Sequence, residues 1–212
     1  MNEMPDLSEV RGPVLVAVNK RNDPLPDPDM VSYYALESDR KLYLDREIDR
    51  DTLALQRMIL RFNMEDRGKA PVDRKPILLY IFSYGGDVDY MWGLIDAIET
   101  SETPVYTVNM GVAASAAAQI FMAGHKRFML SRAKVVIHEG SARMAGDSVK
   151  VLDASDSYRK TIKQMKEYIL SRTAITPACL SKQHSHDWEL DSAYCLEHCV
   201  CDSVVKSLGD IL

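Results

Sequence analysis

The pattern of apolar and polar positions predicts strands that alternate with helices along most of the chain. Residues 77–82 are apolar without alternation, which is typical of a parallel strand covered on both faces. Shorter apolar runs and helical periodicities predict the remaining elements: strands at 41–44, 105–108, 127–130 and 134–137, and helices at 51–65, 88–100 and 112–123. This alternation indicates a layered α/β domain with right-handed crossovers.

A long, charge-rich helix is expected from about residue 147 to residue 172. Apolar residues nevertheless recur along it: Val151, Leu152, Tyr158, Ile162 and Met165. A single domain of this size does not need such a stripe for its own core, so the stripe predicts a partner surface.

The N-terminal segment has a different composition. Residues 22–29 contain three prolines, three aspartates and one asparagine, and prolines this dense disfavour a regular helix or a central strand. We therefore expect an extended, partly mobile arm over residues 1–38 and one domain over residues 39–212.

Charge and hydropathy exclude several classes of function. The 212-residue chain has a net charge of −5, whereas nucleic-acid platforms are usually basic. Its apolar runs are shorter than the roughly 20 residues that span a bilayer, so no membrane segment is expected. The first residues are acidic and do not resemble a signal peptide, which predicts a cytoplasmic protein.

The four cysteines lie near the C-terminus, at Cys179, Cys195, Cys199 and Cys201. In the cytoplasm we expect them to be reduced. Cys195, Cys199 and Cys201 together with His198 suggest a zinc site, but their spacing differs from that of paired C-x-x-C knuckles. We interpret them as small, partly buried residues and expect neither a metal nor an organic cofactor.

Three short motifs contain the candidate chemistry. Ser115 lies in the run of small residues 111–118, where a strand gives way to a helix, and His138 directly follows the buried strand 134–137. Serine needs a neighbouring base to become a nucleophile, so this pair is the smallest set of residues that acyl transfer requires. The third motif, residues 83–87, has paired glycines that let a backbone N–H face a substrate carbonyl.

The order of these motifs, S-x-G-G, then G-x-A-A-S, then a strand ending in His, resembles the ClpP family of serine peptidases over most of the chain, about residues 39–205. The resemblance implies a ClpP/crotonase-type layered spiral of strand–helix units, with a handle at about 139–172. It also implies an endopeptidase that cuts unfolded polypeptides inside two stacked heptameric rings fed by a partner ATPase of the AAA+ class. By the same resemblance Ser115 is the nucleophile, His138 is the base, and the N–H groups of Gly86 and Ala116 form the oxyanion hole.

The family also places an aspartate after the handle to orient the histidine. Aligning backwards from residues 201–202 puts Gln183 at this position, whereas counting forward from His138 favours Asp187. A carboxylate offsets imidazolium charge and a neutral amide does not, so we predict Asp187, with Asp191 or no acid as the alternatives.

Some positions depart from the family pattern. Tyr84 stands where the family usually has proline, and 139–140 reads Glu-Gly instead of Gln-Pro. These departures suggest a divergent or phage-like branch, and the sequence does not distinguish a phage from a cellular origin. Two alternatives to general degradation remain: a phage-type processing protease and a catalytically silent ring subunit. A crotonase-fold acyl-CoA enzyme shares the oxyanion-hole architecture but has no need of this Ser/His pair.

Overall fold

The computed structural model describes residues 27–138, 140, 145–182 and 187–211. The chain divides into two compact units, with the boundary between Lys41 and Leu42. The described part of the first unit contains helix α1 (Pro28–Ser38). For these residues the expectation of an extended arm is wrong: Pro28 occupies the first turn, where its missing N–H costs nothing, and the Asp27 carboxylate accepts from the N–H of Asp29.

The described strands form a single sheet with a parallel central part. The strands are β1 (Lys41–Leu44), β2 (Ile77–Ser83), β3 (Val105–Ala114), β4 (Lys126–Leu130), β5 (Lys134–Ile137), β6 (Trp188–Leu190) and β7 (Ser203–Val205). The order is β1-β2-β3-β4-β7, and β5 pairs with the end of β3 and with β6. Strand β5 is parallel to β3 and antiparallel to β6, so β5 brings the end of β3 and the C-terminal region together.

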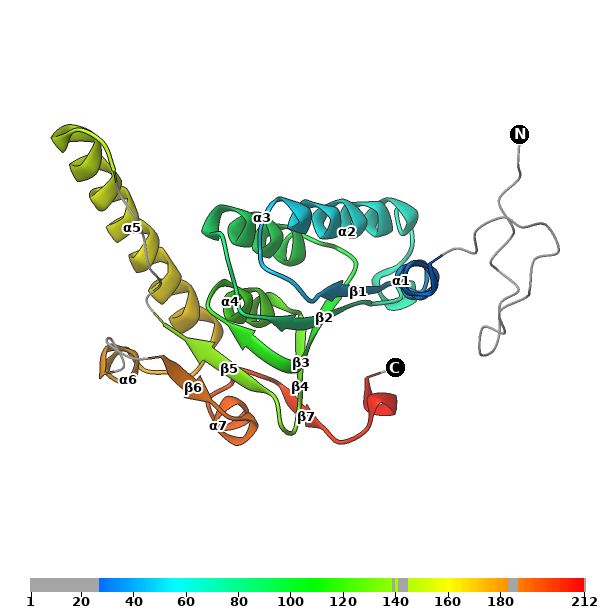
Figure 1. Ribbon diagram of the computed structural model, residues 1–212. Helices are drawn as coiled ribbons and strands as arrows, with labels where there is room; N and C mark the ends of the chain where they lie inside the picture. Colours follow the sequence, from blue (N-terminus) through cyan, green and yellow to red (C-terminus); the bar gives the residue numbers. More distant parts are fainter. Residues whose placement is uncertain (1–26, 139, 141–144, 183–186, 212) are drawn as a thin grey trace. The chain divides into compact units, whose positions relative to one another are not determined.

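Helices of the second unit cover one face of this sheet (Figure 1). They are α2 (Leu53–Glu65), α3 (Val88–Glu99), α4 (Ala116–Ala123), α5 (Ser148–Arg172), α6 (Pro177–Lys182) and α7 (Ser192–Glu197), with short 3-10 turns at Arg50–Thr52, Pro71–Asp73 and Leu208–Asp210. The mixed α/β architecture with a parallel sheet confirms the predicted fold class and agrees with a ClpP-type fold.

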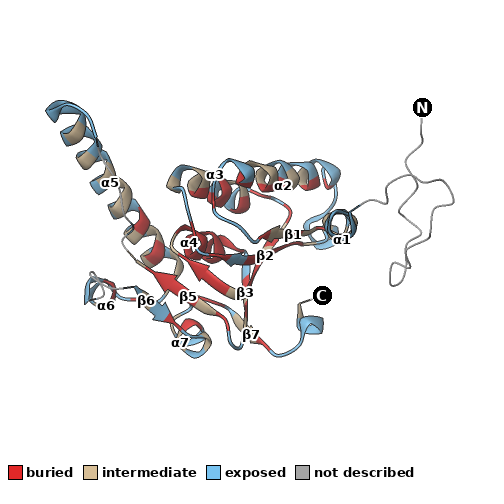
Figure 2. Cartoon of the chain, viewed as in Figure 1, coloured by how far each residue is buried: buried red, intermediate tan, exposed pale blue. Residues whose placement is uncertain are grey.

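Helices α4 and α5 differ sharply in burial (Figure 2). Every residue of α4 is buried, because its alanines let it pack closely against the sheet. In α5 only Met165 and Ile169 are buried, whereas Val149 and Leu152 near its beginning are about two-thirds exposed. The helix predicted from about 147 to 172 is therefore present, and part of its apolar surface faces solvent.

The predicted boundary at Ser115 needs one correction. Residues 112–114 continue β3 instead of beginning a helix, and α4 starts at Ala116. Small residues suit a tightly packed strand as well as a helix, so the run Gly-Val-Ala-Ala gave no signal for the boundary. No helix in the described part of the chain is long and apolar enough to cross a bilayer.

Candidate active site

Ser115 occupies a strained turn between β3 and α4. Its backbone angles are φ 56° and ψ −124°, a combination close to the first central residue of a type II′ turn and normally reserved for glycine. The turn is held in place because the N–H of Ser115 donates to the carbonyl of Val136 in the neighbouring strand, at 2.8 Å. Strain that persists in a well-packed core is typical of functional positions.

The glycine loop predicted to face the substrate lies directly against Ser115. A Cβ atom on Gly85 would stand 2.7 Å from Cβ of Ser115, and one on Gly86 would stand 2.3 Å from the carbonyl oxygen of Ile48. Both glycines have positive φ, of 104° and 150°. Only glycine fits either position, so the close approach of this loop to the serine depends on both residues.

Hydrogen bonds fix the loop on both sides and leave one donor unused. The N–H of Ile48 donates to Gly85 at 2.9 Å, and the N–H of Asp87 donates to Ile48 at 2.8 Å. The Ser83 hydroxyl accepts from the N–H of Gly85 at 3.2 Å, so this serine has a structural role. The N–H of Gly86 donates no hydrogen bond to any described residue.

Ala116 supplies the second predicted oxyanion-hole donor. It is the first residue of α4, so its N–H has no helical carbonyl to bond, and no acceptor among the described residues takes its place. Gly86 and Ala116 flank Ser115 from two different elements, one in the glycine loop and one in α4. Two unused N–H groups beside a serine are the arrangement that stabilises a developing oxyanion.

His138 follows β5 and is half-buried. It lines two cavities together with Ser115, so the structure brings the two predicted residues to one place. Its Nδ1 accepts a hydrogen bond from the N–H of Gly140, at 2.9 Å. Within the described residues no hydrogen bond joins His138 to Ser115.

The pairing of β5 with β6 brings Asp187 to a position opposite His138. Ile137 pairs with Trp188 at the end of this antiparallel ladder, so His138 and Asp187 are the next residues of the two strands. The Asp187 side chain is exposed, and no described residue shares a hydrogen bond with it. The structure therefore places the predicted acid beside the histidine without joining their side chains.

The other candidates for the acid have different positions. Gln183 lies outside the described residues. Asp191 caps α7, where its Oδ1 accepts from the N–H of Tyr194 at 2.8 Å. A carboxylate used as a helix cap already has a structural role, which weakens Asp191 as an alternative to Asp187.

Two cavities meet at Ser115 and His138. A small one of about 30 Å³ extends towards the base of α5. An open groove of about 520 Å³ shares Ser115 and His138 with it and is also lined by Tyr84, Gly86 and Tyr158. A groove that ends in a small pocket beside the serine can hold an extended chain with one side chain inserted.

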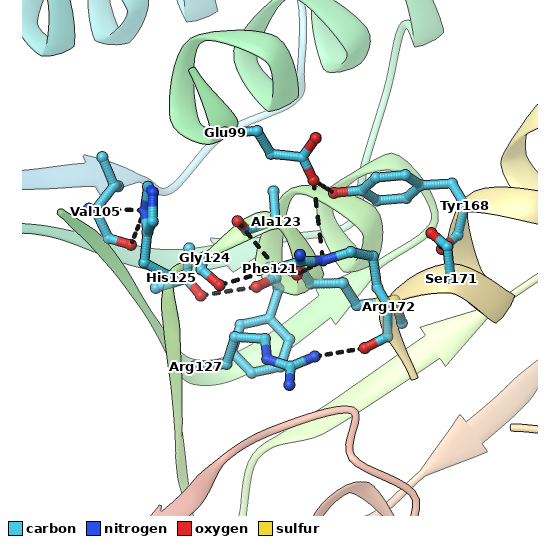
Figure 3. A network of polar contacts seen from close by, with 12 residues as sticks. Glu99, Val105, Phe121, Ala123, Gly124, His125, Arg127, Tyr168, Ser171 and Arg172 are labelled. Carbon is cyan, nitrogen blue, oxygen red and sulfur yellow. Dashed lines mark hydrogen bonds and ion pairs between the residues drawn. The ribbon is translucent and has the colours of Figure 1, made fainter. Parts of the chain in front are cut away.

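A dense polar network fixes the opposite end of α4 (Figure 3). Arg172, at the end of α5, donates to the carbonyls of Met122 at 2.9 Å and Gly124 at 3.1 Å, and it lies 3.9 Å from the Glu99 carboxylate. Arg127 in turn donates to the carbonyl of Arg172 at 2.8 Å. The spacing of these residues in the sequence gave no signal for this network, because its members come from four separate elements.

All four cysteines lie in the described part of the chain, and two of them are buried. Cys195 and Cys201 are buried, and burial raises the pKa of both thiols, that of Cys201 to about 11. Both are therefore poor nucleophiles. Among the described residues no group of three or more His, Cys, Asp or Glu side chains could hold a metal ion.

Comparison with known proteins identifies the family. The family model described as Clp protease matches residues 29–208. The chain belongs to the Clp protease family. It is 30% identical, over 139 residues, to the ATP-dependent Clp protease proteolytic subunit 2 of Treponema pallidum, a match that covers 65% of this chain and 70% of that protein.

Other members of the Clp protease family match over a longer range. The proteolytic subunit 2 of Rhodococcus jostii is 28% identical over 177 residues, or 82% of this chain and 88% of that protein. The proteolytic subunit 1 of Streptomyces coelicolor is 26% identical over 180 residues, or 82% and 78%. The predicted family is thus confirmed, and membership places the chain among peptidases.

Proposed function

We propose that this chain is a serine endopeptidase that cuts unfolded or tagged polypeptides, with Ser115 as the nucleophile. The observation that carries the proposal is the strained turn at Ser115, which lies between two unused N–H groups and shares its cavities with His138. In the reaction the Ser115 hydroxyl oxygen attacks the scissile carbonyl carbon while Nε2 of His138 takes the hydroxyl proton. The N–H groups of Gly86 and Ala116 donate to the resulting oxyanion.

The collapse of this intermediate completes the acylation step. The carbon–nitrogen bond breaks, His138 returns its proton to the leaving amine, and the acyl group stays on Ser115. Water then attacks the ester with His138 again as the base, which releases the new carboxylate and restores the serine.

With the hydrogen bond from Gly140 in place, His138 cannot act as the base, so the described arrangement corresponds to a resting state of the site. An imidazole whose Nδ1 accepts a hydrogen bond carries its proton on Nε2, and that nitrogen cannot take another proton from Ser115. We propose that activation replaces the Gly140 N–H with the Asp187 carboxylate, which accepts from a protonated Nδ1. This exchange moves the free lone pair to Nε2, where the base needs it.

A fluorophosphonate tests the nucleophile directly. The reagent should modify Ser115, as located by mass spectrometry, and Ser115→Ala should abolish both labelling and peptide hydrolysis. Retained labelling in the variant would mean that another serine performs the chemistry.

The acid is tested by a matched pair of variants. Losing the acid of a serine-protease triad costs about four orders of magnitude in kcat, so Asp187→Asn should approach His138→Ala in severity. Asp191→Asn should keep full activity, because asparagine caps a helix as well as aspartate does. Full activity in Asp187→Asn would leave a Ser/His dyad.

We also propose that the subunit works in closed, stacked rings with a partner ATPase, in the cytoplasm. The relatives are named ATP-dependent proteolytic subunits, and the exposed Val149 and Leu152 on α5 suit an interface. Leu152→Glu should split the particle in light scattering and lower peptidase activity together, whereas Lys163→Glu, at a strongly exposed charged position on the same helix, should do less. A fully active monomeric wild type would contradict the ring.

A silent ring subunit remains the second candidate. The Gly140 hydrogen bond and the exposed Asp187 favour it, because neither would be selected against in a subunit that performs no chemistry. Failure of the wild type to react with fluorophosphonate, alone or in its assembled state, would favour this candidate. A processing protease for one dedicated protein would instead label at Ser115 and ignore unrelated unfolded chains.

A further inference from the structure

One buried polar group in the small cavity beside Ser115 has no partner. Gln119 lies near the start of α4, four residues after Ser115 in the sequence. Gln119 is 2% exposed and lines the cavity together with Ser115 and His138. Its Oε1 is fully buried and accepts no hydrogen bond from any described residue.

The rest of the cavity wall is largely apolar. Ile137, Met165, Ile169 and Leu180 line it, and each of them is buried. A carbonyl oxygen left unpaired in such surroundings is costly, and native proteins almost always satisfy these groups. Because Gln119 lines the cavity, its unpaired acceptor is suited to a donor that arrives with a ligand.

We propose that this cavity receives the substrate side chain next to the attacked carbonyl, and that Gln119 makes the enzyme prefer a neutral hydrogen-bond donor there, namely the carboxamide of glutamine or asparagine. This inference rests on the proposed serine-peptidase function. The carboxamide N–H donates to Oε1 of Gln119, while its methylene groups contact the apolar wall.

Two further features narrow the preference. Lys166 also lines the cavity, and its positive charge disfavours a lysine or arginine side chain, although both could donate a hydrogen bond. The cavity is narrow, which disfavours the wide rings of tryptophan and phenylalanine. A neutral, medium-sized donor is the class that satisfies both conditions.

The test uses the full-length chain and internally quenched peptides that differ only at the residue whose carbonyl is attacked. That residue is glutamine, methionine or glutamate, which are similar in size and differ in hydrogen bonding. Fluorophosphonate labelling of Ser115 first counts the active sites, and rates are expressed per labelled site. The wild type should cleave the glutamine peptide with a kcat/KM about tenfold above that of the methionine peptide, since one hydrogen bond to a buried acceptor is at stake.

Variants of Gln119 locate the preference. In Gln119→Met the advantage of glutamine over methionine should disappear or invert, because the acceptor is gone and the volume is kept. In Gln119→Glu the preference for glutamine over methionine should persist, because an acceptor remains. The wild-type comparison alone can already reject the idea, so it does not depend on either variant folding.

The outcomes separate this inference from the proposed function. No labelling of Ser115 would overturn the proposed function itself. Labelling with equal rates for glutamine and methionine, as expected if a water permanently satisfies Gln119, would overturn the carboxamide preference and leave the peptidase intact. A preference for glutamate would assign the selectivity to the charge of Lys166, and would also overturn it.

Discussion

The two ends of helix α4 are opposites in their polar chemistry. At its C-terminal end the carbonyls of Met122, Ala123 and Gly124 all accept from the Arg172 guanidinium. At its N-terminal end the N–H of Ala116 has no described acceptor, and within the first turn and a half Oε1 of Gln119 has no donor. Every helix leaves unpaired groups at both ends, and here the protein satisfies one end and leaves the other open.

The satisfied end is also fixed by its neighbours (Figure 3). Tyr168 donates to the Glu99 carboxylate at 2.8 Å, and Glu99 in turn lies beside Arg172. Burial and this hydrogen bond raise the pKa of Tyr168 well above its usual value, so its hydroxyl remains a donor throughout the physiological range. A helix anchored so firmly at one end can hold a strained, unsatisfied site at the other.

The largest expected effect comes from Arg127, which links the network to β7. Its side chain donates to the carbonyls of Arg172 and Cys199 and pairs with Asp202 at 2.6 Å. Arg127→Met leaves these acceptors without their donor, and we expect the free energy of unfolding in urea to fall by about 3 kcal/mol. The control Arg159→Met removes an exposed i,i+3 pair with Asp156 and should cost less than about 0.5 kcal/mol. Equal losses in the two variants would contradict the importance of the network.

Arg172 itself should have the next largest effect. Arg172→Met removes the donor from three carbonyls at the end of α4, and because the side chain is one-third exposed we expect a loss of about 2 kcal/mol. Arg172→Lys keeps the charge, but a single ammonium group cannot reach carbonyls on several sides, so its loss should be intermediate. If lysine restored full stability in urea denaturation, the positive charge alone would explain how Arg172 stabilises the end of α4.

The open end should respond in the opposite direction. Ser115→Gly relieves the positive φ at the turn, and we expect it to raise the free energy of unfolding by about 1 kcal/mol while abolishing hydrolysis. Ser115→Ala should abolish hydrolysis without this gain, since alanine is strained there as serine is. An equal gain in both variants would assign it to loss of the hydroxyl and not to the backbone.

The smallest effect is a pH dependence at Asp202. Burial raises the pKa of this carboxyl, but the hydrogen bond and charge of Arg127 outweigh burial and lower the pKa overall. A pKa that is lower in the folded state stabilises the fold above the unfolded value of about 3.9, and this stability is lost as the pH falls towards the folded pKa. The wild type should therefore exceed Asp202→Asn in stability at pH 7, by less than about 1 kcal/mol because the side chain is partly exposed. In thermal melts between pH 7 and pH 3 the difference should shrink below about pH 4, and a constant difference would contradict this account.

Local sequence patterns predicted the fold class and most of the central elements. The apolar strand β2 was recognisable because an uninterrupted apolar run is typical of a strand covered on both faces, and His138 was recognisable because it directly follows such a run in β5. Helix α1 was missed because the rule against proline in helices does not apply at the first turn. Gln119 and Arg172 were missed for a different reason: their roles depend on elements that lie 18 to 73 residues away along the chain, from Ile137 for Gln119 to Glu99 for Arg172.

Strand β6, which directly follows Asp187, affects how stably Asp187 is held at the site. Strand β6 has only three residues, and among the described strands it pairs with β5 alone. Ser115 is tied instead to the core through Val136. Short, singly paired strands open at a lower free energy than the core, so amide hydrogens of Trp188–Leu190 should exchange with deuterium well before those of β3. On the proposed assignment, Asp187 can thus leave the site and return while Ser115 and His138 stay folded, and catalytic competence would then depend on local opening and not on global stability.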